Sequence, residues 1–380
     1  MSEASFSAAD TAFMARALQL ARRGLYTTHP NPRVGCVLVR DGEIIGTGFH
    51  ERAGQAHAEI NALRAAGDAS GTDAYVTLEP CSHVGRTPPC ADALITAGVQ
   101  RVVVAMRDPN PLVAGRGLAR LHEAGIRVQS GLLEEQARAL NPGFIAVMER
   151  GRPWVRVKLA MSLDGRTAMA SGESRWITGE AARHDVQFWR AQAGAILTGI
   201  GTVLADRPAL NVRLEPEVLG ITGAIRQPLR VILDSRLQLQ PDAGLLQLQG
   251  PVQVFTCSTD VQRIQALEAR GVMVQRMAGA QPALDVVLQQ LGRTGVNEVH
   301  VEAGSTLAGA LLAQGLVDEL LVYMAPHLMG SLARPLFGLE LEHMAERVAL
   351  AIQDIRAVGR DWRILARVAP AVSIGVGAAG

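Results

Sequence analysis

The sequence predicts an α/β protein of two domains, residues 1–150 and 151–369, with a tail at 370–380 that we expect to be disordered. Its 380 residues are enough for two domains of ordinary size. The first part alternates helical spacings with short apolar strands, an order typical of three layers, α/β/α. Gly151-Arg152-Pro153 is a plausible boundary before a second series of strands and helices.

The first domain should begin with a helix and a hairpin. Asp10 is well placed as the N-cap of a helix that ends at Gly24. Asp41-Gly42 reads as the turn between strands at 34–39 and 43–49. Further helices are expected at 57–65, 91–97 and 117–123, and further strands at 74–78, 101–106 and 126–128.

The second domain also mixes strands and helices. Strands are expected at 154–160, 195–198, 230–233, 252–256, 298–302 and 319–324, and helices at 180–191 and 307–313. The segment Gly199-Ile200-Gly201-Thr202 lacks the third glycine of G-x-G-x-x-G and does not follow the first strand of a βαβ unit, so an ordinary Rossmann domain is disfavoured. Such a turn can present N–H groups to a phosphate, although most glycine-rich turns are only turns.

Composition limits the possible partners. The 37 basic and 36 acidic residues leave a net charge of +1, without the basic excess that nucleic acids or anionic membranes attract. No apolar run is long enough to span a bilayer, and an acid stands in the first six residues where a secretory signal has bases. Four cysteines are too few for a disulfide scaffold. We therefore expect a cytoplasmic protein that binds neither nucleic acid nor membrane.

His57, Cys81 and Cys90 form a candidate metal site. One imidazole and two thiolates are the ligands that zinc takes when a fourth position is left for water. Glu59 lies close enough in sequence to serve that water as a proton shuttle. The pattern is the H-x-E…P-C-x-x-C arrangement of zinc nucleobase deaminases, except that eight residues rather than two separate the cysteines.

Two other interpretations of these residues stay open. The cysteines could be small buried side chains, with His57 a satisfied surface residue. Alternatively, His83 or His50 could supply a fourth ligand and close the site into a structural zinc centre.

Six segments carry a family resemblance. THPNPRVG at 28–35, HAE at 57–59 and EPCSHVGRTPPC at 79–90 resemble the deaminase half of the bifunctional riboflavin-biosynthesis deaminase–reductases, which share the long cysteine spacing. KLAMSLDGR at 158–166, SGESRWIT at 171–178 and VEAGSTL at 301–307 resemble the reductase half. The resemblance extends over about residues 10–368. It implies a cytidine-deaminase-like first domain and a dihydrofolate-reductase-like second domain.

The resemblance implies two successive reactions. Zinc-dependent deamination would act on 2,5-diamino-6-ribosylamino-4(3H)-pyrimidinone 5′-phosphate, and NADPH would then reduce the ribose of 5-amino-6-(5-phosphoribosylamino)uracil to a ribityl chain. Asn31 suits recognition of a pyrimidine edge, or is a turn residue between two prolines. His83, Arg86 and Thr87, between the cysteines, are candidates for the ribose phosphate or are simply solvated.

The resemblance also implies the contacts of the second site. Those to the dinucleotide would come from Ala160, Trp176, Thr202, Asp206, Gly304, Ser305, Thr306, Leu307, Ala308, Gly309 and Ala310, with Ser235 as a weaker candidate. Those to the substrate would come from Ser174, Arg190, Leu210, Arg213 and Glu302. The guanidinium groups of Arg190 and Arg213 suit the 5′-phosphate.

Lys158 and two departures complete this second site. Lys158 could favour the imine or ring-opened state of the sugar, or be an exposed strand lysine. Ser305 stands where the family often has proline, and Arg207 where it often has aspartate. Either departure could alter the backbone or the charge near the cofactor.

Two other functions are compatible with parts of the sequence. A zinc deaminase of another nucleotide or of nucleic acid, with a binding module as second domain, is an alternative. For a nucleic-acid substrate the neutral charge and the lack of interleaved aromatic and basic residues are unfavourable. A non-catalytic, zinc-stabilised interaction protein is a third. A homo-oligomer through the C-terminal domain is a further expectation, with the apolar strand at 320–324 as the candidate interface.

Overall fold

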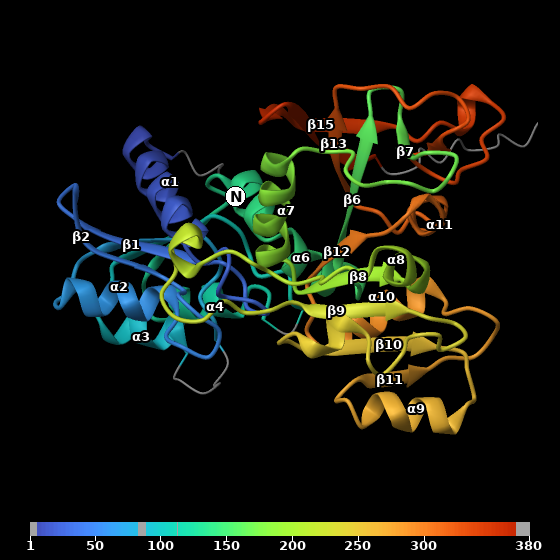
Figure 1. The fold of residues 1–380 in the computed structure, drawn as a ribbon. Coiled ribbons are helices and arrows are strands. Elements are labelled where there is room, and N and C mark those ends of the chain that lie inside the picture. The colour runs from blue at the N-terminus through green and yellow to red at the C-terminus, as the bar shows by residue number, and fades with distance from the viewer. Residues whose placement is uncertain (1–5, 83–88, 112, 370–380) are drawn as a thin grey trace, which may run out of the picture. The chain divides into compact units, whose positions relative to one another are not determined.

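The computed structural model describes residues 6–82, 89–111 and 113–369 (Figure 1). They form two compact units, one made of residues up to Pro153 together with Glu215–Arg226, the other of Trp154–Leu214 and the residues from Gln227 onward. The first unit therefore includes a short segment from the second half of the sequence. The tail expected at 370–380 lies outside the described residues.

The first unit is built on a five-stranded sheet of order β2-β1-β3-β4-β5. β1 pairs antiparallel with β2 and β3, whereas β3, β4 and β5 run parallel. The strands are β1 (Gly35–Arg40), β2 (Glu43–Phe49), β3 (Asp73–Val76), β4 (Arg101–Val104) and β5 (Arg127–Ser130). The expected hairpin at Asp41-Gly42 joins the first two, and both turn residues have positive φ.

Helices cover both faces of this sheet, because its strands are apolar on both sides. Val37 and Val39 pack with one group of helices, and Cys36 and Leu38 with the other. The first group is α1 (Ala8–Arg22), α5 (Glu134–Leu140) and α6 (Pro142–Arg150), and the second is α2 (Ala58–Ala66), α3 (Cys90–Thr96) and α4 (Arg116–Glu123). The three-layer prediction is confirmed.

The N-cap of α1 is Ser7, so the prediction of Asp10 was wrong. The Ser7 hydroxyl accepts from the backbone N–H of Asp10 at 3.0 Å, and the Asp10 carboxylate accepts from the N–H of Ser7 at 2.8 Å. The buried Asp10 carboxylate also accepts from the Tyr75 hydroxyl and pairs with Arg101. Asp10 thus fixes the helix to the sheet beneath it.

The second unit contains a nine-stranded sheet of order β11-β10-β9-β8-β12-β6-β13-β16-β15. In this order, the strands from β11 to β13 are parallel to one another. β16 is antiparallel to both of its neighbours, β13 and β15. The strands are β6 (Trp154–Ser162), β8 (Ala195–Gly199), β9 (Leu229–Leu233), β10 (Val252–Thr256), β11 (Met273–Arg276), β12 (Glu298–Glu302), β13 (Glu319–Ala325), β15 (Leu350–Val358) and β16 (Asp361–Val368). β7 (Arg166–Ala168) and β14 (Arg334–Pro335) form a separate pair.

Helices again lie on both faces. α10 (Leu284–Arg293) and α11 (Ser305–Ala313) pack in the largest core cluster. α7 (Glu180–Gln192), α8 (Ile200–Asp206) and α9 (Val261–Glu268) cover the opposite face. Short 3₁₀ helices occupy Pro216–Leu219, Gly244–Gln247 and Met344–Glu346. The α/β class predicted for this unit is confirmed.

The strand at 320–324 does not form a surface. It lies in β13, between β6 and β16, and Leu320, Leu321 and Val322 are buried within their own unit. Its apolar side chains reflect a sheet covered on both faces, so the prediction of an interface there was wrong.

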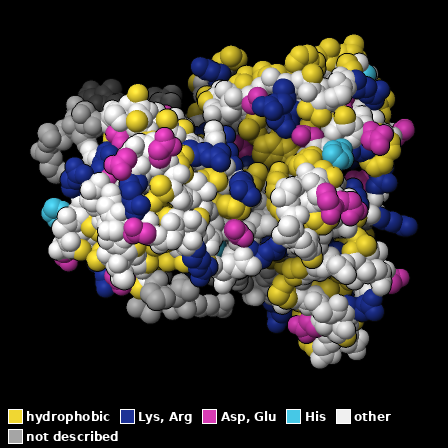
Figure 2. Space-filling view, turned by 90° about the vertical axis from the view of Figure 1, so that its left-hand side faces the viewer, with side chains coloured by type: hydrophobic (Ala, Val, Ile, Leu, Met, Phe, Trp, Pro, Cys, Tyr) yellow, Lys and Arg dark blue, Asp and Glu magenta, His cyan; other side chains and the backbone are white. Residues whose placement is uncertain are grey.

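Across the three described ranges, no helix combines the length and the hydrophobicity that crossing a bilayer would require. On the face shown in Figure 2, basic and acidic side chains are interspersed.

Candidate active sites

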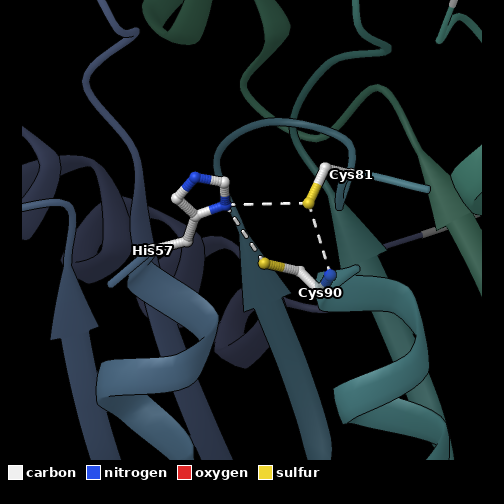
Figure 3. A group of neighbouring side chains, drawn as sticks. All are labelled: His57, Cys81 and Cys90. Atoms are coloured by element: carbon white, nitrogen blue, oxygen red, sulfur yellow. Dashed lines mark hydrogen bonds between the residues drawn. The ribbon is translucent and has the colours of Figure 1, made fainter. Parts of the chain in front are cut away.

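His57, Cys81 and Cys90 come together at one end of the first unit's sheet (Figure 3). His57 is the N-cap of α2, Cys81 follows β3 in a loop, and Cys90 is the first residue of α3. His57 Nδ1 lies 3.2 Å from Cys90 Sγ and 3.6 Å from Cys81 Sγ. A tetrahedral zinc ion, with bonds of about 2.0–2.1 Å to nitrogen and about 2.3 Å to sulfur, places such atoms about 3.6 Å apart. The donor set and its spacing therefore fit zinc.

The surroundings favour a thiolate at Cys81. Hydrogen bonding with Cys90 lowers the pKa of Cys81 to about 4, and the backbone N–H of Cys90 donates to Cys81 Sγ at 3.3 Å. The hydrogen bond between the two cysteine side chains raises the pKa of Cys90. A second hydrogen bond, between Cys81 and His57, raises the pKa of His57. Thiolate is the form of cysteine that binds metals. The interpretation of both cysteines as small buried side chains does not fit Cys81, which is partly exposed and lies 3.6 Å from His57 Nδ1.

Glu59 lies in the first turn of α2 and is buried. Burial raises the pKa of its carboxyl group to about 7. A carboxyl group that titrates near neutrality can both accept and return a proton. Glu59 thus suits the proton shuttle predicted for it.

His50 is not a fourth ligand. Its Nδ1 lies 3.1 Å from the carbonyl oxygen of Ala56 and its Nε2 lies 3.0 Å from Asn31 Nδ2. Its ring meets that of His57 edge-on, with centroids 5.4 Å apart, and burial lowers its pKa. In the described ranges the metal-ligand group contains His57 and the two cysteines alone. The other fourth-ligand candidate, His83, and the phosphate candidates Arg86 and Thr87 lie outside the described residues.

Glu79 supports the metal site and was not predicted. Its buried carboxylate accepts backbone N–H groups from the segment that leads into α4, at 2.9 to 3.3 Å, namely those of Asp108, Gly115, Gly117 and Leu118. A Cβ at Gly117 would lie 2.1 Å from the carbonyl oxygen of Pro80, so this close approach requires glycine. Glu79 and Gly117 therefore hold the loop that carries Cys81. Its only signal in the sequence is its place two residues before Cys81.

Arg190 and Glu302 form the centre of the second site. Arg190 on α7 donates from Nε and Nη2 to the two carboxylate oxygens of Glu302, at 2.6 and 2.8 Å. Its Nη1 donates to the carbonyl oxygen of Asn211 at 2.9 Å. Burial acts to raise the pKa of Glu302, but the charge and hydrogen bonds of Arg190 hold it well below its usual range. The Nε/Nη2 edge of Arg190 is thus occupied by a carboxylate, and the role of Arg190 in binding the 5′-phosphate stays a prediction.

Lys158 belongs to the same group of charges. It lies on β6, in register with Glu302 on β12, and is only partly exposed. Burial lowers the pKa of Lys158, the charge of Glu302 opposes this, and the charge of Arg190 adds to it. The interpretation as an exposed strand lysine is therefore wrong.

Arg213 and Leu210 lie in the segment that Arg190 contacts. The Arg213 guanidinium donates to Asn211 Oδ1 at 3.1 Å, and burial, with the charge of Arg190, lowers its pKa. Leu210 is buried and has positive φ. Lys158, Arg190, Arg213 and Glu302 thus share one electrostatic environment, as expected of a site for an anionic substrate. Ser174 lies apart in sequence, between β7 and α7.

His300 is a second residue that sequence reasoning missed. It is fully buried on β12, and its Nε2 lies 3.4 Å from Glu302 Oε1. Neither ring nitrogen has a hydrogen-bond partner in the described residues. Its signal was the alternation Glu298-Val299-His300-Val301-Glu302, which places three polar side chains on one face of a buried strand.

Most of the predicted cofactor residues follow the carboxyl ends of adjacent parallel strands, where open α/β sheets bind ligands. β8 leads into α8, which carries Thr202 and Asp206; Ser235 follows β9; and β12 leads into Gly304 and α11. The segment predicted as a glycine-rich loop is thus the end of β8 and the start of α8. α11 contains Ser305, Thr306, Leu307, Ala308, Gly309 and Ala310.

Ala160 lies near the carboxyl end of β6, the strand beside β12, and Trp176 lies in the segment between β7 and α7. Trp176 is 65% exposed, and the guanidinium of Arg183 lies 4.5 Å from its ring centroid. Its neighbour Arg175 forms an ion pair with Asp206. Ala160 is on β6, in register with Tyr323 of β13.

The two departures from the family pattern fall at helix ends. Ser305 is the first residue of α11, a position that proline also favours, so the helix starts normally without it. Arg207 is the C-cap of α8 and has positive φ.

Family models match most of the chain. The model described as the RibD C-terminal domain matches residues 153–364, and the cytidine and deoxycytidylate deaminase zinc-binding region matches residues 7–106.

Whole-length relatives are similar as well. The riboflavin biosynthesis protein RibD of Escherichia coli is 53% identical over 93% of this chain and 97% of its own. That of Bacillus amyloliquefaciens is 43% identical over 93% of this chain and 95% of its own.

Among solved structures, RibD of Acinetobacter baumannii superposes with a TM-score of 0.88 at 48% identity, covering 95% of this chain and 99% of its own. A diaminohydroxyphosphoribosylaminopyrimidine deaminase/5-amino-6-(5-phosphoribosylamino)uracil reductase of Thermotoga maritima gives 0.84 at 33% identity, with the same coverage of 95% and 99%.

Proposed function

This chain belongs to the RibD family of bifunctional riboflavin-biosynthesis enzymes, and we propose which of its residues carry out each reaction. It is a deaminase that uses zinc and a reductase that uses NADPH. We assign it the substrates named by the family: the diaminopyrimidine ribosyl 5′-phosphate, then 5-amino-6-(5-phosphoribosylamino)uracil. A nucleic-acid deaminase with a separate binding module, or a non-catalytic zinc protein, is not favoured.

The cluster of His57, Cys81 and Cys90 beside Glu59 is the observation that supports deamination most strongly. These three ligands would hold zinc, which supplies a water of lowered pKa when bound. Glu59 accepts a proton, passes it to a ring nitrogen and then assists the amino group to leave as ammonia. Asn31 binds the edge of the pyrimidine.

The charged group around Glu302 supports the reduction. NADPH supplies a hydride for C1′ of the sugar. Lys158, in its protonated form, stabilises the ring-opened sugar, and the Arg190–Glu302 pair holds the neighbouring segment in place. Because the fork of Arg190 is occupied, Arg213 is the better candidate for the 5′-phosphate. Leu210 and Ser174 would complete the substrate contacts.

The cofactor would lie along the carboxyl edge of the parallel strands. Thr202 and Asp206 on α8, Ser235 and the Gly304 turn follow the strands β8, β9 and β12, which are neighbours in the sheet. The nine-residue helix α11 begins there, and its first N–H groups suit a phosphate. Trp176 and Ala160 would make the remaining contacts.

The experiment that tests this function follows the purified protein and the diaminopyrimidine nucleotide, with and without NADPH. Ammonia should be released in both cases, and NADPH should be oxidised only after deamination. Absence of ammonia release, or NADPH oxidation before deamination, would contradict the proposed sequence of reactions.

A homo-oligomer through the second unit is also proposed. Apolar side chains are exposed on β15, the edge strand of the nine-stranded sheet, and on its neighbour β16: Leu350 at 47%, Ile352 at 60%, Ile355 at 51% and Trp362 at 46%. An apolar edge of this kind is suited to pairing with another chain. Ile352→Asp should lower the mass measured by sedimentation, whereas Gln353→Glu, on the same strand, should not.

We also propose a cytoplasmic location. All four cysteines are free thiols, and the two metal-binding ones must stay reduced to bind zinc.

A further inference from the structure

His50 makes one hydrogen bond through each of its two ring nitrogens. The residue follows β2 and is 2% exposed. Its Nδ1 lies 3.1 Å from the carbonyl oxygen of Ala56, and its Nε2 lies 3.0 Å from the amide nitrogen of Asn31. The ring therefore connects the loop before His57 to the segment that carries Asn31.

The partner of Nδ1 determines the tautomer of the ring. A carbonyl oxygen can only accept a hydrogen bond, so Nδ1 must carry a hydrogen. No carboxylate is hydrogen-bonded to either ring nitrogen, and a buried imidazole without such a partner is neutral. Nε2 is then an acceptor.

An acceptor at Nε2 determines which way the Asn31 amide points. The NH₂ group must face His50, because an amide oxygen there would meet another lone pair. Oδ1 and the second amide hydrogen remain for another partner. In the described residues, the Asn31 side chain makes no other hydrogen bond.

We infer that His50 is a positioning residue of the deaminase site, which fixes the Asn31 amide to present an acceptor and a donor to the pyrimidine. The inference rests on the proposed role of Asn31 in binding the ring. It also defines the edge that is recognised: an N–H donor adjacent to a ring or carbonyl acceptor, as in an aminopyrimidinone. A ring edge with two acceptors would leave Oδ1 facing a lone pair.

A packing role is the alternative to be separated from this one. The His50 and His57 rings also lie nearly perpendicular to each other, with centroids 5.4 Å apart. If His50 only supported His57, its loss would weaken zinc binding and would act independently of Asn31.

A double-mutant cycle distinguishes the two roles. Asn31→Ala, His50→Phe and the double variant are compared for deaminase kcat and KM, zinc content, and reductase activity on the deaminated intermediate. Each single variant should raise KM about tenfold with a smaller change in kcat, and the double variant should resemble Asn31→Ala. Zinc content and reductase activity should match the unmodified protein.

His50→Gln is the conservative variant, because its Oε1 can still accept from the Asn31 amide. It should recover part of the affinity that His50→Phe loses. The positioning role would be overturned if the KM increases of the two single variants multiplied in the double variant. Loss of zinc in His50→Phe, or a KM in His50→Gln as high as in His50→Phe, would also overturn it. An unchanged KM in Asn31→Ala would also overturn it, whereas failure of the proposed deamination itself would appear as absent ammonia release from the unmodified protein.

Discussion

Arg190 donates two hydrogen bonds to Glu302, linking α7 to the carboxyl end of β12 across 112 residues of sequence. Both side chains are largely buried. The two charges of the pair act in opposite directions on Lys158: Glu302 raises the pKa of the lysine and Arg190 lowers it. Loss of either partner should therefore affect both stability and chemistry.

Glu302→Ala should destabilise the second unit by about 3–5 kcal/mol, because it leaves the Arg190 guanidinium buried without its partner. Urea unfolding, followed with a probe in the second unit, measures this. Arg356→Ala is the control, because it removes an exposed ion pair with Asp354 and should cost at most about 1 kcal/mol. Equal effects of the two substitutions would show that the Arg190–Glu302 pair is not a buried structural element.

The pH dependence of reduction should reflect Lys158. Burial lowers its pKa below the ordinary value, so the protonated form, and with it kcat/KM on the deaminated intermediate, should be lost at a lower pH than for an exposed lysine. Glu302→Gln removes the charge that raises this pKa, and should move the alkaline limb further down in pH.

Lys158→Arg tests the same assignment, because arginine stays protonated. Any activity that this variant retains should lack the alkaline limb. A limb at unchanged pH in Lys158→Arg, or NADPH oxidation unaffected by Lys158→Ala, would remove Lys158 from the reaction.

Glu79→Gln should weaken zinc binding about 10- to 100-fold, the usual effect of disturbing the residues that orient a metal ligand. The substitution replaces one carboxylate oxygen by a donor, which cannot accept the N–H groups of the segment before α4. Competition of the full chain with a chromogenic chelator measures the affinity. Glu123→Gln, at an exposed position on α4, should leave it unchanged; a similar affinity for both variants would contradict the role of Glu79.

Much of the first site could be predicted because its chemistry is local in sequence. His57 and Glu59 lie two residues apart at the start of one helix, and Cys81 and Cys90 lie nine positions apart, the second at the start of α3. The supporting residues depend on distant segments. Glu79 is satisfied by backbone N–H groups from residues 108–118, and the tautomer of His50 depends on the carbonyl group of Ala56. Residue type alone does not indicate such partners.

The second unit was less predictable for the same reason. The strands of its centre are apolar runs, and these were expected nearly where they lie. Whether such a strand is interior or at an edge depends on its neighbours in the sheet. For this reason the strand at 320–324 suggested an interface, although it lies inside the sheet. The sequence also did not indicate that Arg190 would pair with Glu302, which lies 112 residues away.

Glu59→Gln gives the most direct test of two separate sites in one chain. Ammonia release from the diaminopyrimidine nucleotide should fall about 10²- to 10⁴-fold, because the substitution removes the proton shuttle. NADPH oxidation by the same variant, supplied with the deaminated intermediate, should proceed at the rate of the unmodified protein, with zinc content unchanged. Ammonia release that survives the substitution, or reduction that is lost together with it, would contradict the account.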